Sequence, residues 1–135
     1  MRGVITFAVT GLVLSAACGH PPSDFSTSNA RTHLEQLAGV IGSRPTGTAA
    51  NARARAYLSG ALTRAGFRVR VQTADAVNAR FGVSGRVHNI IAVRDGARRE
   101  AIGLVAHYDS VAEGAGAGDD GIGSATVAEA GGGLV

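Results

Sequence analysis

The stretch AIGLVAHYDSVAEGAGAGDDGIG (residues 101–123) joins an apolar run to a glycine-rich loop and is the strongest indication of fold class in the chain. Its first six residues, 101–106, carry no polar side chain, which predicts a strand buried on both faces. His107 follows at the carboxyl end of this strand, where open α/β sheets bind their ligands. Asp119 and Asp120 lie in the loop, which can bend freely at its glycines. One imidazole and two adjacent carboxylates favour a divalent cation, above all zinc.

Each of these signals also has a purely structural interpretation. A histidine at a strand end is often held by hydrogen bonds alone, and Asp-Asp-Gly is often a turn or a helix cap. Residues 116–121 also match the dinucleotide pattern G-x-G-x-x-G, but that pattern should follow its strand directly, and here a long loop intervenes. Histidine and carboxylates in this order after a buried strand favour the metal site. Asp109, two residues beyond His107, projects to the same side in extended backbone and is placed to orient the imidazole.

The rest of the chain alternates helical and strand patterns. A first helix is expected to start near residues 26–29 and to run to about Ile41, and Gly66 is expected to end a second one. The expected elements are helices over 26–41, 49–65 and 121–130 and strands over 67–73, 86–94 and 101–106. This order predicts an α/β fold that opens as a layered α/β sandwich with a mixed sheet.

The amino terminus has the layout of a signal peptide. Arg2 precedes an apolar run over residues 4–14, which is too short for a comfortable membrane span. Residues 14–18 (LSAAC) resemble a bacterial lipobox, although Ser15 stands where an aliphatic residue is usual. We therefore expect residues 1–18 to be a signal peptide with Cys18 lipidated; ordinary cleavage near Ala17 and an uncleaved anchor are the alternatives.

The domain organisation and location follow from this layout. Residues 19–28 are predicted to be a linker and residues 29–135 the folded part, exported to the cell envelope and held at the membrane by the amino terminus. Cys18 is the single cysteine, so no internal disulfide is possible.

The distribution of charge bears on the kind of partner. All thirteen basic residues are arginines within residues 1–99, but they are dispersed and aromatic residues are few. This pattern argues against nucleic-acid binding.

Four segments together resemble the M28 family of zinc peptidases. Residues 107–110 (HYDS) and 116–123 (GAGDDGIG) resemble the first metal motif of that family. Residues 43–48 (SRPTGT), before an Arg/Ala-rich helix, and residues 87–92 (VHNIIA) resemble its preceding segments. The resemblance covers about residues 30–130. It implies a phosphorylase/hydrolase-like, three-layer α/β sandwich and two zinc ions that activate a water to hydrolyse peptide substrates.

The resemblance also assigns roles to individual residues. His107 would ligate one zinc, Asp119 would bridge both, and Asp109 would support His107 from outside the ligand set. Asp120 would follow Asp119 across a peptide bond that is often cis in the family.

The family's general base, a glutamate in an acidic pair, and its later Asp and His ligands have no counterpart here, and Glu129 lies at the wrong place. We therefore expect a truncated amino-terminal piece of an exported aminopeptidase-type enzyme that is inactive alone. The alternative is a non-catalytic, envelope-anchored remnant or interaction module.

Overall fold

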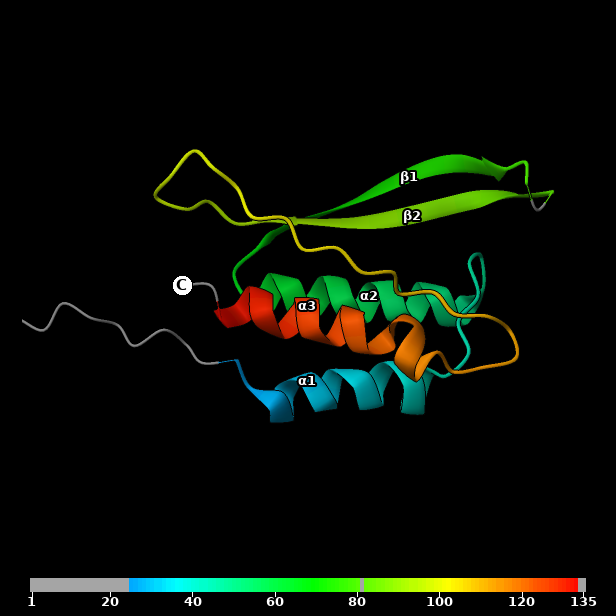
Figure 1. Ribbon diagram of the computed structural model, residues 1–135, viewed down its shortest axis with the longest axis horizontal. Coiled ribbons are helices and arrows are strands. Elements are labelled where there is room, and N and C mark those ends of the chain that lie inside the picture. The colour runs from blue at the N-terminus through cyan, green and yellow to red at the C-terminus, as the bar shows by residue number, and fades with distance from the viewer. Residues whose placement is uncertain (1–24, 81, 134–135) are drawn as a thin grey trace, which may run out of the picture.

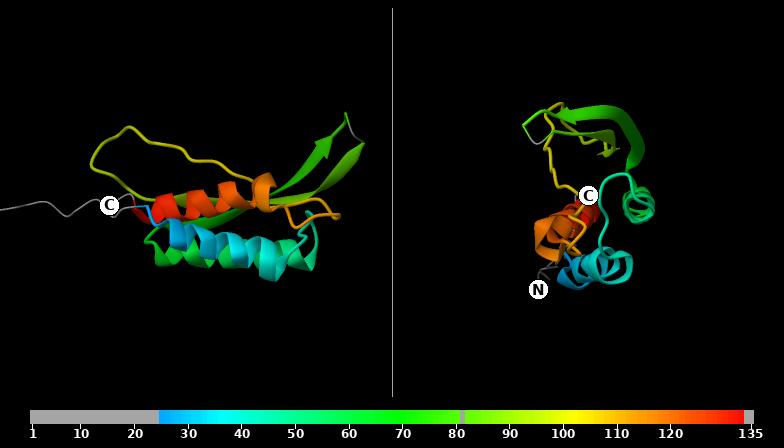
Figure 2. Two further views of the ribbon diagram at one scale, coloured as in Figure 1. Left: turned by 60° about the horizontal axis from the view of Figure 1, so that its bottom comes forward. Right: turned by 90° about the vertical axis from the view of Figure 1, so that its right-hand side faces the viewer.

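The computed structural model describes residues 25–80 and 82–133 as a small α/β structure of helices beside a two-stranded sheet (Figure 1). The helix axes lie roughly parallel, with α1 running in the opposite sense to α2 and α3, and α3 contacts both α1 and α2 (Figures 1 and 2). The sheet contacts α2 through both of its strands. In chain order the elements are α1 (Thr27–Leu34), η1 (Glu35–Ile41), α2 (Ala49–Arg64), β1 (Arg68–Asn78), β2 (Val83–Val93), η2 (Ala117–Gly121) and α3 (Ile122–Gly133).

Local capping signals explain where the first two helices begin. The Ser26 side chain accepts a hydrogen bond from the Asn29 backbone N–H at 3.2 Å and caps α1. Thr48 caps α2 in the same way by accepting from the Asn51 N–H at 3.1 Å. α1 passes without a break into the wider turns of η1. The helical segment therefore ends at Ile41, as the sequence predicts.

Two glycines with positive φ end the helical segments. Gly42 (φ 77°) follows η1, and Gly66 (φ 87°) follows α2, whose last helical residue is Arg64. A residue with a side chain adopts this conformation only with strain, whereas glycine does so freely. The chain thus reverses after α2 and enters the sheet.

The sheet is an antiparallel hairpin. β1 pairs with β2 along its whole length, from Arg68 opposite Val93 to Asn78 opposite Val83. Both strands are longer than the alternation of residue types predicts, and β1 is exposed over most of its length. Most of the hairpin therefore lies away from the helices.

Residues 101–106 are not a strand in this structure, contrary to our prediction. They run as an irregular segment, and the residues Ile102, Leu104 and Val105 are 83%, 48% and 95% exposed. A buried strand needs a hydrogen-bonding neighbour on its edge and cover on both faces. No described residue pairs with this run, so its apolar character alone does not make it a strand.

The hydrophobic core lies between the helices, and Tyr108, the neighbour of His107, packs against it. Leu37, Ala54, Leu58 and Ala128 form its buried centre, and Tyr108 packs against it from the segment that carries His107. The Tyr108 hydroxyl also donates a 2.6 Å hydrogen bond to the His88 carbonyl oxygen on β2. The backbone next to His107 is therefore fixed to both the helices and the sheet.

The predicted signal peptide, Cys18 and most of the predicted linker lie outside the described residues. α1 begins at Thr27, inside the 19–28 range that the sequence assigns to the linker. Over the part of the chain that the structure describes, no helix is both long and apolar enough to cross a membrane.

Candidate metal centre

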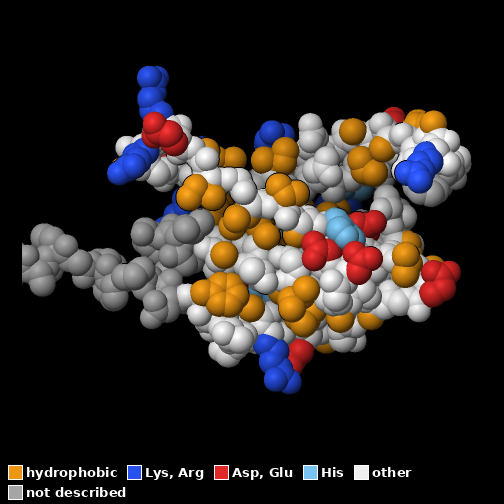
Figure 3. Space-filling view, in the orientation of Figure 1, with side chains coloured by type: hydrophobic (Ala, Val, Ile, Leu, Met, Phe, Trp, Pro, Cys, Tyr) orange, Lys and Arg blue, Asp and Glu red, His pale blue; other side chains and the backbone are white. Residues whose placement is uncertain are grey.

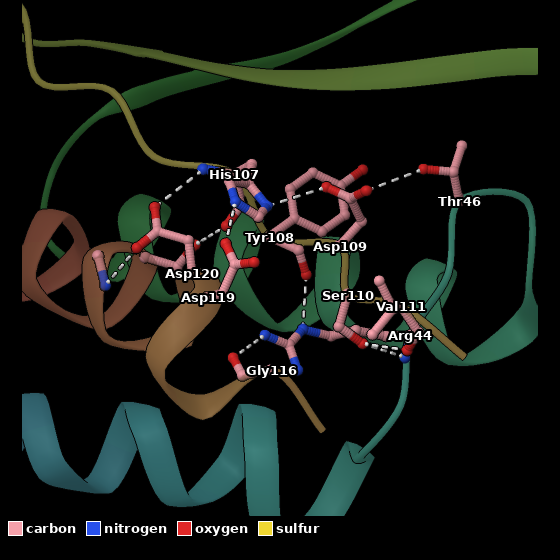
Figure 4. A network of polar contacts seen from close by, with 12 residues as sticks. Arg44, Thr46, His107, Tyr108, Asp109, Ser110, Val111, Gly116, Asp119 and Asp120 are labelled. Carbon is pink, nitrogen blue, oxygen red and sulfur yellow. Dashed lines mark hydrogen bonds and ion pairs between the residues drawn. The ribbon is translucent and has the colours of Figure 1, made fainter. Parts of the chain in front are cut away.

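His107 and Asp119 meet on an open surface of the molecule (Figure 4). The imidazole Nε2 lies 3.0 Å from Asp119 Oδ1, and the two side chains are 54% and 91% exposed. Asp119 reaches this position because its backbone leaves the helical conformation (φ −132°, ψ 90°) between two helical segments. In the space-filling view, carboxylates gather around an exposed imidazole (Figure 3). The structure thus brings together the two residues that the sequence nominates as metal ligands.

The second ring nitrogen of His107 faces another carboxylate. Nδ1 lies 3.3 Å from Asp109 Oδ1, and the other oxygen of Asp109 accepts a hydrogen bond from the Thr46 hydroxyl at 3.3 Å. A carboxylate on one ring nitrogen fixes the tautomer and makes the other nitrogen a better metal ligand. Asp109 therefore lies where a supporting residue would need to be, and Nε2 is the nitrogen that faces Asp119.

A neutral imidazole cannot satisfy both carboxylates. It carries one N–H, so one of the two contacts would place lone pairs opposite each other unless a second proton or a cation is present. Burial disfavours the charged ring, but the hydrogen bond with Asp119 and the negative charges of Asp109, Asp119 and Asp120 outweigh it and raise the pKa of His107 above its ordinary value. The site therefore has an electrostatic preference for positive charge.

Asp120 contacts the backbone rather than the ring. Its Oδ1 accepts a hydrogen bond from the Gly123 N–H at 3.1 Å, and its Oδ2 accepts from the His107 N–H at 3.3 Å. The first contact satisfies a free N–H at the start of α3, as a capping carboxylate does. The peptide bond between Asp119 and Asp120 is cis, as the family resemblance implies. The two adjacent carboxylates thus serve different purposes.

The His107 backbone is also held from its carbonyl side. Ser124, buried in the first turn of α3, donates a 2.9 Å hydrogen bond to the His107 oxygen. Sequence reasoning missed both Ser124 and Thr46, because a hydroxyl in a helix or a loop gives no sign of its distant partner. Only the weak hint that residues 43–48 resemble a family segment pointed to Thr46.

The donors of His107 and Asp119 fit one zinc ion in part. Zinc takes nitrogen and oxygen ligands at about 2.0–2.2 Å in tetrahedral geometry, which places two ligand atoms roughly 3.3–3.5 Å apart. The observed 3.0 Å separation is within a few tenths of an ångström of that value. Among residues 25–80 and 82–133, however, no group of three or more His, Cys, Asp or Glu side chains is arranged to hold a metal ion. The fit therefore covers two ligand positions and not a whole site.

Glu129 takes no part in the site. Its Oε1 accepts hydrogen bonds from the Ser26 backbone N–H at 3.0 Å and from the Asn29 side-chain amide at 3.4 Å. This carboxylate therefore ties α3 to the start of α1.

A cavity of about 840 Å³ opens beside the site. His107, Asp109 and Asp120 are among its polar lining residues, and apolar side chains of α2, α3, β2 and the 104–106 segment line much of the rest. Its volume is within the range of small-molecule binding sites. Polar groups of the candidate metal centre therefore border an apolar space.

Comparison with known proteins agrees with the family resemblance. Residues 89–134 match the model of peptidase family M28, and this segment contains His107, Asp109, Asp119 and Asp120. The chain is also 34% identical over 146 aligned residues to leupeptin-inactivating enzyme 1 of Streptomyces exfoliatus. That alignment covers 96% of this chain and 32% of the relative, so the chain spans about one third of the relative's length. The resemblance to M28 peptidases is confirmed.

Proposed function

We propose that this chain, whose residues 89–134 match peptidase family M28, supplies metal ligands to a zinc-dependent exopeptidase of aminopeptidase type. His107 and Asp119 would be the ligands. The observation that carries the proposal is the 3.0 Å approach of His107 Nε2 to Asp119 Oδ1, with Asp109 on the other ring nitrogen. The match to a peptidase family supports the same reaction class.

The residues of the site have separable roles in this proposal. Two zinc ions, when bound, would lower the pKa of a water and polarise the scissile carbonyl of a peptide. Asp109 would keep the proton on Nδ1, so that Nε2 presents its lone pair. Asp119 would ligate both cations, since its side chain is exposed and its second oxygen is open to solvent. Asp120 and Ser124 would hold the His107 backbone in place through its N–H and its carbonyl oxygen.

The described residues supply too few groups for hydrolysis in this scheme. They provide two ligand positions, and Glu129 is engaged by α1. We therefore propose that further ligands and a general base are needed to complete the site. We propose that the complete domain is the three-layer sandwich of the family, in which residues 101–106 would gain strand neighbours.

The location in this proposal comes from the sequence. The apolar run at residues 4–14 and Cys18 after small residues support export to the cell envelope and attachment to the membrane by a lipid. Peptides are the proposed substrates. The related enzyme from Streptomyces is named for the inactivation of leupeptin.

Zinc titration of the full chain tests the proposed ligands. Isothermal calorimetry would compare the wild-type chain with His107→Gln and, as a matched control, His88→Gln. His88 lies on β2, where its Nδ1 lies 2.9 Å from Thr73 Oγ1, and among the described residues no carboxylate forms a hydrogen bond or ion pair with its ring. We expect weak zinc binding that His107→Gln abolishes and His88→Gln preserves.

Two results would contradict the proposal. Absence of zinc binding by the wild-type chain, or equal binding by His107→Gln, would favour the non-catalytic interaction module instead. Robust hydrolysis of unblocked peptides by the purified 135-residue chain would contradict the claim that these residues are insufficient.

A further inference from the structure

Arg44 is the largest fully buried side chain that the structure describes. A buried cation is costly unless its hydrogen-bond donors are satisfied. Every side-chain hydrogen bond that Arg44 makes in this structure is donated to a backbone carbonyl oxygen rather than to a carboxylate. The acceptors are Tyr108 (Nε, 2.5 Å), Leu37 (Nη1, 3.5 Å), Gly42 (Nη1, 3.2 Å), Ala115 (Nη1) and Gly116 (Nη2, 3.2 Å).

Three of these carbonyls, those of Tyr108, Ala115 and Gly116, belong to the two segments that carry the candidate ligands, and Figure 4 shows the contacts with Tyr108 and Gly116. Tyr108 stands between His107 and Asp109. Ala115 and Gly116 lead directly into η2, where Asp119 is found. One planar guanidinium therefore ties the backbone beside the imidazole to the backbone that precedes the carboxylate.

Further contacts fix Arg44 and the loop against each other. The Arg44 backbone N–H donates to Ser110 Oγ at 3.0 Å, and the Arg44 oxygen accepts from the Asn51 side chain of α2 at 3.2 Å. The Gly116 oxygen, which Arg44 contacts, also accepts from the Gly121 N–H at 2.9 Å and closes the turn around Asp119. A Cβ on Gly121 would lie 3.2 Å from Arg44 Nη2, so the loop is closely fitted to the guanidinium.

We propose that Arg44 is a positioning residue of the metal centre, which sets the separation of His107 and Asp119 by binding the carbonyls of Tyr108 and Gly116 together. This inference rests on the proposed function. Arginine suits the role because its donors form a rigid planar fork, whereas lysine offers one flexible ammonium group. Lysine at this position would keep the charge and lose the simultaneous contacts.

Zinc affinity of the full chain tests this role. Arg44→Lys would be compared with Arg53→Lys, a matched change at an exposed arginine on α2. At a temperature where circular dichroism shows both variants folded, we expect Arg44→Lys to weaken zinc binding by about 10–100-fold, as loss of residues that orient ligands does. Arg53→Lys should bind like the wild type. A folded Arg44→Lys with wild-type zinc affinity would overturn the proposal.

Amide hydrogen exchange of the metal-free chain separates this inference from the proposed function. We expect Arg44→Lys to speed exchange at His107 and Gly121 relative to α1, and unchanged exchange there would overturn the positioning role even if zinc binds. Failure of the wild-type chain to bind zinc would instead defeat the proposed function.

If Arg44→Lys does not fold, Ser110→Ala provides a second test. This change removes the hydroxyl that accepts a hydrogen bond from the Arg44 backbone N–H and keeps the guanidinium. It should weaken zinc binding several-fold, and unchanged affinity would again overturn the proposal.

Discussion

Asp119 and Asp120 are consecutive residues, but their carboxylates contact different parts of His107. Asp119 Oδ1 lies 3.0 Å from the ring Nε2, whereas Asp120 Oδ2 accepts from the backbone N–H at 3.3 Å. Asp120 also accepts from the Gly123 N–H, and Asp119 is 91% exposed. One carboxylate is therefore available to a ligand, and the other is used by the fold. Substitutions at the two positions should have different effects.

Asp119→Asn should remove zinc binding and leave the fold intact. The change keeps the size of the side chain but removes the charge that faces Nε2. We expect zinc affinity to fall by at least the roughly 100-fold seen when residues around a metal ligand are lost. Because the side chain is exposed, the metal-free free energy of unfolding should change by less than about 0.5 kcal/mol. Calorimetry and urea denaturation measure the two quantities, and a stable variant that binds zinc normally would exclude Asp119 as a ligand.

Asp120→Ala should destabilise the fold itself. Loss of a capping carboxylate costs about 0.5–2 kcal/mol, and here the His107 N–H loses its acceptor as well. Urea denaturation of the metal-free chain would measure this loss. Asp75→Ala is the control, because Asp75 forms an exposed ion pair with Arg86 and such pairs contribute little. Equal stability of the Asp120 and Asp75 variants would show that the cap is unimportant.

Gly123→Ala tests how tightly the Asp120 carboxylate is fitted. Alanine in a helix is normally about 1 kcal/mol more favourable than glycine. At Gly123, however, a Cβ would lie 2.1 Å from Asp120 Oδ1, so the carboxylate would have to leave its position. We expect the clash to win, with a net destabilisation of about 1–3 kcal/mol and weaker zinc binding.

Gly118→Ala is the matched control for this glycine. Nothing lies within 4 Å of a Cβ at that position, although Gly118 is only five residues away, in η2. Its stability should equal or slightly exceed that of the wild type. If thermal denaturation shows the two alanine variants to be equally stable, the close fit at Gly123 is wrong.

The sequence predicts those features that depend on nearby residues. Ser26, Thr48 and Gly66 act on backbone groups within a few positions, so the helix ends follow from local chemistry. The pairing of His107 with Asp119 was also predictable, because the glycines of the loop allow the chain to fold back within twelve residues.

Features that depend on distant neighbours were not predictable. Residues 101–106 have the composition of a buried strand, but burial depends on which strands lie beside them, and no described residue pairs with them. The role of Arg44 depends on carbonyl oxygens, which every residue carries, so no residue type marks its partners. The contact of Ser124 could not be predicted for the same reason, because its acceptor is the backbone carbonyl oxygen of His107.

His33 should make the stability of the metal-free chain depend on pH. Its Nδ1 lies 2.7 Å from the Tyr57 hydroxyl, and the two rings meet edge to face. Burial lowers the pKa of His33 below its ordinary value of 6.5; the charge of Glu129 opposes this shift, and that of Arg64 adds to it. Because the folded pKa is the lower one, the unfolded chain binds more protons as pH falls through about 6.5. The contribution of neutral His33 to the free energy of unfolding is therefore complete above about pH 6.5, and it decreases as the pH falls from there through the lower folded pKa.

Urea denaturation at pH 7.5 and 5.5, with a chelator present, measures this contribution against His33→Gln. We expect the wild-type chain to lose more stability on acidification than the variant does. His107, whose pKa is raised, shifts stability in the opposite direction, but it is present in both chains and cancels in the difference. Tyr57→Phe keeps the buried imidazole and should retain the pH dependence. If wild type and His33→Gln show the same change between the two pH values, His33 does not titrate with a lowered pKa.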